Sequence, residues 1–535
     1  MNQRKLLSLL LAALMLLSLS VPALAEDIST TTVTATDGET VTVDGIELEG
    51  DESYIGAVAN GDGSSITVGG DVVTTGSTYP GEEGIYGVIA LEGGTVDVGG
   101  NVTGGDMGVF ADGDEAASTI TVAGDVTATG VFGGVQAGNG TVTVGGNVTA
   151  TEAEGGVAAG QGGTVSVGGD VTGGSSGVLV QGGTVDVGGN VTGIGVGVDA
   201  AEGGTVTVGG DVAATDDNGV GIYAYGESTV DVAGSVSGGL DGILTDNAAT
   251  VSVGGDAAGS EAGIYVIPVE DEEETGKGQI LVEGTVSGDT AAIIVVVNDL
   301  LTEDASAMKD NAADIIPDII VSTLESSKEL IYSDLYTDDD DPITVSDDVM
   351  AQVMNAITQN IYYIINADGN ISVEGDGIVS KAGFDTATEG TVLLLSAADG
   401  YEVEESFGRY VTEWVRNDDG SYLLFVARGG DLVFSAKVRA VTPASTDPSA
   451  APAAGSVKTL KNSEKGTFSV RFSHFVSAEL DGETVDPANY TVSQASNGLT
   501  VFGFTDEFVG TLDPGTHNGT LRFTDCSYNF GLVVE

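Results

Sequence analysis

Basic side chains are scarce in this sequence and almost absent from its first half. The chain has 16 Lys and Arg residues against 81 Asp and Glu residues, a formal charge of −65, and no Lys, Arg or His lies between Lys5 and Lys277. Such a surface repels nucleic-acid phosphates and anionic lipids, and it attracts divalent cations. We therefore expect no nucleic-acid partner, no cofactor, and at most weak binding of Ca²⁺.

Cysteine and long apolar runs are scarce as well. Cys526 is the only cysteine, so a disulfide within the chain is excluded. The one long apolar run, residues 6–21, follows Arg4 and Lys5 and precedes Ala23-Leu24-Ala25. This is the pattern of a secretory signal peptide, whereas no second run could span a membrane. We expect residues 1–25 to be removed, leaving an extracellular chain of charge −67, in solution or associated with a cell surface, with no membrane span.

Glycine is abundant, and it belongs to a repeat. The unit reads Thr-Val-x-Val-Gly-Gly-(Asp/Asn)-Val-Thr, then a variable stretch, then Gly-(Val/Ile)-x-Ala. Its first apolar residue recurs every 20–30 residues, at Val41, Ile66, Val96, Ile120, Val142, Val165, Val185, Val206, Val230, Val251 and Ile280. Alternation with a period of two indicates strands, and the Gly pairs indicate turns. One such coil cannot fold alone, so the sequence predicts a stack of coils with a shared core.

The predicted fold class is therefore all-β. We expect a parallel β-solenoid at residues 26–299, with three strands per coil and about 11–12 coils in all. Unequal loop lengths between the second and third strands favour a right-handed β-helix over a left-handed one.

Stacking places equivalent outward residues in columns, and two of these are polar. One is a column of Thr that begins each repeat. The other follows the Gly pair and consists of Asp71, Asn101, Asp125, Asn147, Asp170, Asn190, Asp211, Ser235, Asp256 and Thr285. Asp never occupies neighbouring coils, where two carboxylates about 4.8 Å apart would repel. We interpret this column as turn chemistry rather than as an array of metal sites.

A third column is mostly apolar, although alternation points it outward. It runs through Val58, Ile89, Phe110, Gln136, Ala158, Leu179, Asp199, Tyr223, Leu244, Tyr265 and Ile294. An exposed apolar stripe indicates a partner surface, and the alternative is that another part of the chain covers it. The candidate partner-binding residues are Phe110, Leu179, Tyr223, Leu244 and Tyr265. No catalytic residue is predicted.

The repeat loses register after Val297, and residues 300–377 are predicted to be an insertion or cap. Ser346 and the apolar positions from Val349 to Ile357 indicate a helix over the open end of the solenoid, and Ile371-Ser372-Val373-Glu374-Gly375 matches the repeat as a final coil. The acidic run Asp338, Asp339, Asp340 and Asp341 lacks the spacing of an EF-hand, so these residues are weak metal candidates and a solvated loop is expected.

Three segments complete the chain. Residues 378–442 are predicted to be a small β-rich module that resembles repeats of secreted bacterial surface proteins, and residues 443–455 a linker rich in Pro, Ala, Ser and Thr. Residues 456–535 carry Leu480-Asp481-Gly482-Glu483, Asn489-Tyr490-Thr491-Val492 and Leu512-Asp513-Pro514-Gly515. These motifs resemble an immunoglobulin-like module of the kind appended to surface proteins of Gram-positive anaerobes.

The solenoid resembles pectate-lyase-like and adhesin β-helices of secreted bacterial proteins, but it carries no catalytic motif of those families. A polysaccharide lyase needs a basic residue, and residues 26–276 have none. We therefore expect a non-catalytic surface, adhesive or structural protein whose partner is an extracellular or cell-surface protein or glycan. The alternatives are a carbohydrate-binding protein, an acidic glycoside hydrolase acting through two carboxylates, and an ice-binding solenoid with Thr-x-Thr files that Asp97, Asp186 and Asp231 interrupt.

Overall fold

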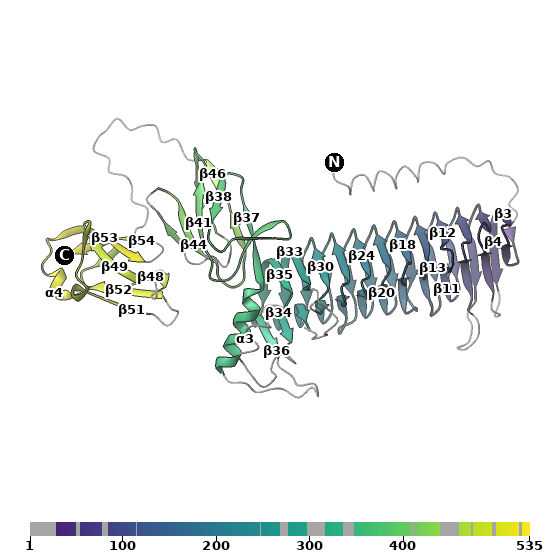
Figure 1. The fold of residues 1–535 in the computed structure, drawn as a ribbon, viewed down its shortest axis with the longest axis horizontal. Helices are drawn as coiled ribbons and strands as arrows, with labels where there is room; N and C mark the ends of the chain where they lie inside the picture. The colour runs from purple at the N-terminus through teal and green to yellow at the C-terminus, as the bar shows by residue number, and fades with distance from the viewer. Residues whose placement is uncertain are drawn as a thin grey trace. The chain divides into compact units, whose positions relative to one another are not determined.

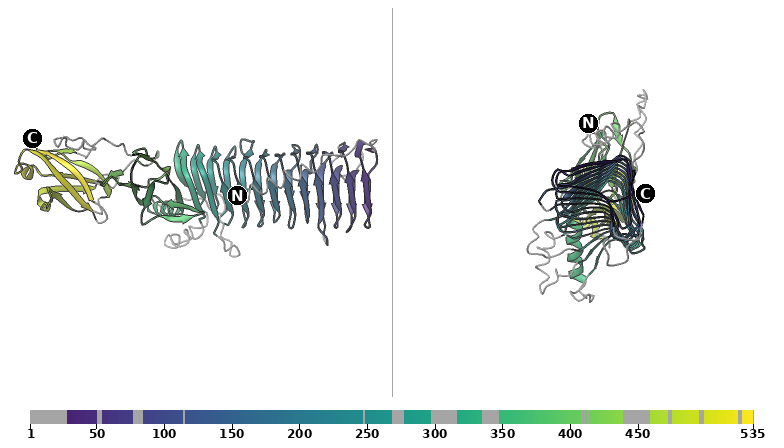
Figure 2. Two further views of the ribbon diagram at one scale, coloured as in Figure 1. Left: turned by 90° about the horizontal axis from the view of Figure 1, so that it is seen from above. Right: turned by 90° about the vertical axis from the view of Figure 1, so that its right-hand side faces the viewer.

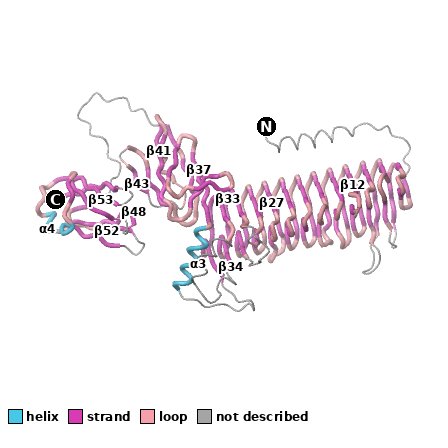
Figure 3. The backbone as a smooth tube through the Cα atoms, viewed as in Figure 1, coloured by secondary structure: helices cyan, strands magenta, loops and turns pink. Residues whose placement is uncertain are grey.

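The computed structural model describes residues 28–534, apart from 50–53, 77–83, 114, 247, 268–276, 297–315, 335–346, 408, 410, 412–413, 418, 439–458, 472–474, 495–498 and 524–526. The chain forms two compact units, residues 1–360 and 361–535. Strands make up nearly all of the regular structure in both units (Figure 3). No helix among the described residues is long and apolar enough to cross a membrane. The predicted signal peptide, Cys526 and Asp338, Asp339, Asp340 and Asp341 lie outside the described residues.

The first unit is a parallel β-solenoid in which each coil contributes a strand to three ladders (Figures 1 and 2). The first ladder consists of β3 (Thr40–Val43), β6 (Ser65–Val68), β9 (Thr95–Val98), β12 (Ser118–Val122), β15 (Gly140–Val144), β18 (Thr164–Val167), β21 (Thr184–Val187), β24 (Thr205–Val208), β27 (Thr229–Val232) and β30 (Thr250–Val253). The second consists of β1 (Ile28–Ser29), β4 (Gly45–Glu49), β7 (Val72–Thr75), β10 (Val102–Gly104), β13 (Val126–Ala128), β16 (Val148–Ala150), β19 (Val171–Gly173), β22 (Val191–Gly193), β25 (Val212–Ala214), β28 (Val236–Ser237) and β31 (Ala257–Gly259). The predicted solenoid with three strands per coil is confirmed.

The third ladder is a parallel sheet of 13 strands. It consists of β2 (Val33–Thr36), β5 (Ile55–Asn60), β8 (Tyr86–Leu91), β11 (Met107–Asp112), β14 (Gly133–Ala137), β17 (Gly155–Ala159), β20 (Ser176–Gln181), β23 (Val196–Ala201), β26 (Val220–Ala224), β29 (Asp241–Thr245), β32 (Ala262–Val266), β34 (Ala291–Val296) and β36 (Glu329–Asp334).

The core is built by the repeated valines. In β9, Val96 and Val98 are buried while Asp97 between them is exposed, which is the alternation expected of a half-buried strand. The glycine at the second position of the third strand is required by close packing. A Cβ at Gly87 would lie 2.5 Å from the carbonyl oxygen of Gly108 in the next coil and 2.5 Å from Cγ1 of Val102. The repeat therefore keeps glycine where the backbone of one coil meets its neighbour.

The solenoid continues beyond the point where the sequence appeared to lose its repeat. β33 (Gln279–Gly288) pairs with both β30 and β31, so one long strand serves the first and second ladders. β35 (Asp318–Ser326) pairs with β33 in the same way, and β36 closes the coil in the third ladder. Within the predicted insertion or cap at residues 300–377, Asp318–Ser326 and Glu329–Asp334 therefore form a further coil of the solenoid, which corrects that part of the prediction. α3 (Asp347–Gln359) confirms the predicted helix, and it contacts β36, the last strand of the third ladder (Figure 1).

The predicted final coil at Ile371 was wrong. β38 (Ile371–Glu374) pairs antiparallel with β41 (Val392–Ala397), which in turn pairs with β44 (Tyr422–Phe425). The small module accordingly begins at Ile361 in the second unit rather than at residue 378. Its other strands are β37 (Ile361–Ala367), β39 (Val379–Lys381), β40 (Phe384–Ala387), β42 (Tyr401–Val403), β43 (Trp414–Arg416), β45 (Leu432–Phe434) and β46 (Ala436–Val438).

The C-terminal module packs two antiparallel sheets on one aromatic core. The five-stranded sheet is β47 (Thr459–Lys461), β54 (Ser527–Val534), β53 (Gly515–Phe523), β49 (Phe475–Leu480) and β50 (Glu483–Thr484), in which β47 alone pairs parallel. The three-stranded sheet is β48 (Gly466–Arg471), β52 (Leu499–Phe504) and β51 (Tyr490–Gln494), with η3 (Pro487–Asn489) and α4 (Asp506–Val509) in the connections. Phe468, Phe502 and Phe530 from the two sheets are fully buried against one another.

Candidate functional site

The predicted column occupies one position of the third ladder, and Gln136, Ala158 and Asp199 interrupt its large apolar side chains. Strand pairing aligns Phe110 with Ile89 and Gln136, and it aligns Tyr223 with Asp199 and Leu244. Leu179 pairs with Asp199, and Leu244 pairs with Tyr265. All five candidate residues thus occupy the same position of the coil in the third ladder, and we call this column the apolar stripe.

The stripe faces away from the core along most of its length. Tyr223 is exposed, and Phe110, Leu179, Leu244 and Tyr265 are half-buried, whereas the Val, Ile, Ala and Thr residues that flank them in sequence are buried. The outward assignment of this strand is therefore confirmed at these positions.

Two members of the column are buried. Ile89 is 7% exposed, and Ile294 is 1% exposed in a cluster with Ala262 and Ala291 against which Tyr265 packs. At its C-terminal end the column therefore contributes to the packing of the solenoid as well as to its outer surface. Tyr223 is the most accessible aromatic ring of the stripe.

A carboxylate interrupts the stripe between Leu179 and Tyr223. Asp199 has one oxygen, Oδ1, that is buried without a hydrogen-bond partner among the described residues, and burial raises the pKa of this carboxyl. The rings of Tyr223 and Tyr225 lie beside it, with centroids 5.0 Å apart and planes inclined by 37°. Burial and then the negative charge of Asp199 raise the pKa of the Tyr225 hydroxyl. The part of the stripe around Asp199 therefore combines aromatic side chains with a carboxylate that is partly removed from solvent.

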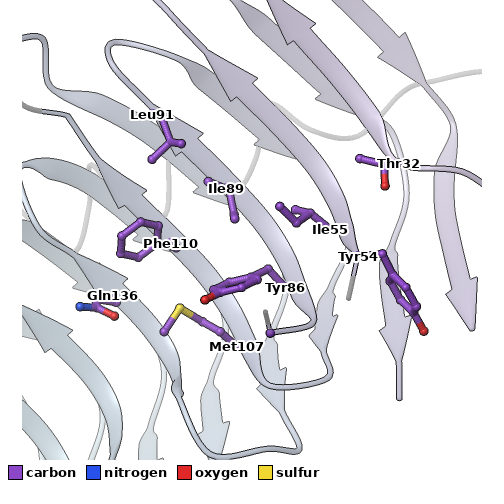
Figure 4. A pocket seen from close by; sticks show the side chains of 10 residues that line it. Thr32, Tyr54, Ile55, Tyr86, Ile89, Leu91, Met107, Phe110 and Gln136 are labelled. Atoms are coloured by element: carbon purple, nitrogen blue, oxygen red, sulfur yellow. The ribbon is translucent and has the colours of Figure 1, made fainter. Parts of the chain in front are cut away.

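Phe110 also lines a cavity of about 490 Å³ near the N-terminal end of the solenoid, together with Ile89 and Gln136 of the same column (Figure 4). The cavity is lined by Thr32, Tyr54, Ile55, Gly84, Tyr86, Ile89, Leu91, Met107, Phe110 and Gln136. Figure 4 shows side chains from neighbouring coils standing around one opening, with Gln136 at its margin. The lining has aromatic rings, hydroxyls and one amide but no charged side chain, although the chain as a whole is strongly acidic. Its size lies within the usual range for small-ligand pockets.

Sequence reasoning missed Tyr54, Tyr86 and Met107 in this cavity. Tyr86 and Met107 pair with each other at the first position of β8 and β11, where most later coils have Gly, Ser, Val or Ala. Tyr86 also stacks on Phe132, with centroids 6.3 Å apart. The sequence did hold a sign of this cavity, because Tyr86 and Met107 are bulky at a position where most later coils have small residues. We overlooked it because this position is not part of the column that defines the stripe.

The Asx column after the Gly pair is a ladder of hydrogen bonds between coils. Each side chain accepts a hydrogen bond from the backbone N–H of the equivalent residue in the next coil. Asn101 N–H donates to Oδ1 of Asp71 at 2.7 Å, and the chain of bonds continues at 2.7–3.1 Å to Thr285. The oxygens thus have a structural use, and the bonds cross between coils rather than closing each turn on itself.

The remaining carboxylates are scattered. Within the part of the chain that the structure describes, no three His, Cys, Asp or Glu side chains come together in a way that could hold a metal ion. In the first ladder, Asp97 pairs with Thr121, and Asp186 and Asp231 both pair with Thr207, so the second Thr file is interrupted as the sequence indicated.

A histidine and the tryptophan of the second unit have structural partners. His517 Nδ1 lies 2.7 Å from Oδ2 of Asp481 and Nε2 lies 2.9 Å from the carbonyl oxygen of Asp513, and these hydrogen bonds raise the pKa of the imidazole. Trp414 packs edge-on against Phe407 and tilted against Tyr422. His474 lies outside the described residues.

Comparisons of the chain with models of protein families, with curated proteins and with solved structures gave no match. The geometry of the solenoid's outer face is therefore the basis for the function that follows.

Proposed function

We propose that the protein is a secreted, non-catalytic surface or adhesive protein that binds extracellular partners through the apolar stripe. The observation that carries this proposal is the outward column from Leu179 to Tyr265. Leu179, Tyr223, Leu244 and Tyr265 are half-buried or exposed at one position of neighbouring coils, interrupted by Asp199, whereas the Thr and Asx columns are polar. Apolar residues gain nothing on a solvated face, whereas they stabilise a complex when a partner covers them.

The Thr and Asx columns need no partner to explain them. The Thr column has the β-propensity and cross-strand contacts that stabilise a ladder, and the Asx column makes hydrogen bonds between coils. The stripe has no comparable structural use around Tyr223 and Leu244. This contrast supports assigning the binding role to the third ladder.

A carbohydrate-binding protein is the second candidate, and the cavity around Phe110 favours it. Aromatic faces stack on sugar rings, and the Gln136 amide could hydrogen-bond sugar hydroxyls, since no interaction of this side chain is made within the described residues. The absence of carboxylates from the cavity lining gives no support to a glycoside hydrolase acting there.

The setting is part of the proposal. The leader pattern of residues 1–25 supports secretion, and the two-sheet C-terminal module, which we take as immunoglobulin-like, supports a role at the cell surface. The partner would be an extracellular or cell-surface protein or glycan.

The test is adhesion of the mature chain, residues 26–535, to bacterial and host cells and to a glycan array. Tyr223→Ser/Leu244→Ser should reduce adhesion about tenfold or more with little change in melting temperature, because both side chains are only partly buried. The matched control is Val131→Ser/Ile194→Ser, which removes two exposed apolar side chains, 57% and 48% exposed, from another corner of the coil.

Three results are informative. Loss of adhesion only in the stripe variant supports the proposal. Loss only in the corner control would move the binding surface away from the stripe. Unchanged adhesion in both, with glycan binding lost on Phe110→Ala, would replace the proposal with the carbohydrate-binding candidate.

A further inference from the structure

The stripe contains one residue that does not suit an apolar partner. Asp199 stands where the neighbouring coils place Leu179 and Tyr223. If the stripe were only a hydrophobic contact surface, a carboxylate here would weaken it, because burying an unpaired charge is costly. The residue therefore indicates a charged feature of the partner.

The carboxylate is already partly desolvated in the free protein. Its Oδ1 is buried without a hydrogen-bond partner among the described residues, while the residue as a whole keeps part of its surface open to solvent. Burial raises the pKa of this carboxyl, which shows that its charged form is disfavoured there. A cation placed beside it would relieve this cost.

Two aromatic rings lie beside the same carboxylate. The centroids of Tyr223 and Tyr225 are 5.0 Å apart, and Tyr223 is exposed while Tyr225 is half-buried. Aromatic faces attract ammonium and guanidinium groups, most strongly where water is partly excluded. Glu202, exposed at the turn after β23, adds a second negative charge close enough to raise the pKa of the Tyr225 hydroxyl.

The coils around Asp199 carry no cation of their own. No Lys, Arg or His occurs between Lys5 and Lys277, so every coil around Asp199 is free of basic side chains. A metal ion would require more carboxylates, and no group of three potential ligands occurs among the described residues. A neutral sugar would donate hydroxyl hydrogen bonds to the carboxylate but would bring no positive charge to offset its desolvation. An organic cation suits both the desolvated carboxylate and the two aromatic rings.

We propose that Asp199, Tyr223 and Tyr225 form a subsite for a lysine or arginine side chain of a partner protein. This inference rests on the proposed function, because it assigns a chemical class to the partner of the same stripe. The carboxylate supplies the charge, the two rings supply cation–π contact, and Leu179 and Leu244 flank the methylene stem of the incoming side chain.

The experiment titrates the mature protein against short peptides in 0.15 M NaCl. The probes are glycine-serine peptides with one central lysine or arginine, and the same peptides with acetyl-lysine or citrulline. Binding is followed by broadening of the peptide NMR lines, which detects weak complexes. We expect the cationic peptides to bind and the neutral ones to bind at least tenfold more weakly.

Asp199→Asn should weaken binding of the cationic peptides about tenfold, and Tyr223→Ser should weaken it while Tyr223→Phe retains it. The matched control is Asp186→Asn, which removes one negative charge from a partly buried aspartate on the first ladder and should change binding less than twofold. Asp199→Asn should melt no lower than the wild type, because it removes a desolvated charge.

The inference is overturned if Asp199→Asn and Asp186→Asn bind the cationic peptides equally, or if no peptide binds. If adhesion still depends on Tyr223 and Leu244 in that case, the proposed function stands and only the cationic ligand is wrong. If Asp199-dependent peptide binding is found without adhesion to any surface, the subsite stands and the adhesive role fails.

Discussion

Buried carboxylates in this protein differ in how many hydrogen bonds they accept from backbone N–H groups. Asp246 is buried but accepts hydrogen bonds from the backbone N–H groups of Gly226, Ala248 and Ala249. Asp241 is 3% exposed and accepts one, from Ala262 at 3.2 Å. Burial first, and then the charge of Glu261, raise the pKa of Asp241 to about 7. The charged form of the Asp241 carboxyl is therefore poorly stabilised in the folded protein.

This difference predicts a pH-dependent loss of stability. The folded state holds a proton on Asp241 between pH 4 and 7 that the unfolded chain, with an ordinary pKa near 3.8, has released. Folding is therefore penalised progressively as the pH rises through this range. Asp241→Asn should be close to the wild type at pH 4 and more stable by about 2–4 kcal/mol at pH 8.

Denaturant unfolding at pH 4, 6 and 8 measures this effect. Asp217→Asn, an exposed aspartate in the preceding coil, is the control and should show no such divergence. A constant difference between Asp241→Asn and the wild type across the pH range would show that the Asp241 carboxyl does not titrate as described.

At the scale of the strand and coil, local alternation predicted the ladders but not their partners. The Val-x-Val step followed by a Gly pair fixed the first and second strands of most coils. The coil at Asp318–Ser326 was missed because β35 runs straight through the first and second ladders, so no Gly pair marks a turn. Ile371–Glu374 has the same alternation, yet it pairs antiparallel. Alternation reports which face a side chain takes, and it carries no information on which strand lies alongside.

The candidate site also has one part that the sequence could predict and one part that it could not. The stripe could be predicted, because Leu179, Tyr223 and Leu244 follow the alternation of their strands. The cavity could not, because it depends on how Tyr54 and Tyr86 from neighbouring coils come together. The proximity of Asp199 to Tyr225 could not be predicted either, because it depends on the strand registers seen in the structure.

Removal of one coil tests the repeat as the unit of the fold. Deletion of residues 185–205 joins Thr184 to Val206 and preserves the ladder, since Val185 and Val206 are register partners. The shortened chain should therefore fold with its β-signal intact. The deletion also removes Asn190, so Asp170 becomes the neighbour of Asp211 in the Asx ladder. Two carboxylates about 4.8 Å apart should cost about 1 kcal/mol.

The prediction is thus a folded but slightly destabilised protein, and Asp211→Asn in the deletion background should restore the lost stability. Far-UV circular dichroism and thermal unfolding measure both effects. Loss of the β-signal would contradict the solenoid as a stack of exchangeable coils, whereas Asp211→Asn without effect would contradict the charge argument alone.

At the scale of the whole molecule, the acidic excess governs how the protein responds to ions. The chain carries a formal charge of −65, and its basic residues other than Arg4 and Lys5 all lie from Lys277 onward. Self-repulsion of this kind destabilises the compact state, and screening or loosely bound cations relieve it. Because the Asx oxygens already accept backbone hydrogen bonds, they are poorly placed to act as dedicated metal ligands.

We therefore predict weak stabilisation by divalent cations without a fixed stoichiometry. Millimolar CaCl₂ and MgCl₂ should raise the melting temperature by similar amounts, a few degrees, and NaCl at equal ionic strength should give part of the effect because screening acts on exposed charges. Calorimetric titration should show no saturable tight site. A few tight sites specific for Ca²⁺ would contradict this, and replacement of Asp338, Asp339, Asp340 and Asp341 by asparagine would then locate them. Loss of the tight sites in this variant would assign them to the acidic run. Their survival would assign them to the carboxylates of the solenoid. In that case the alternation of Asp with Asn would have to be explained by metal coordination rather than by repulsion between carboxylates.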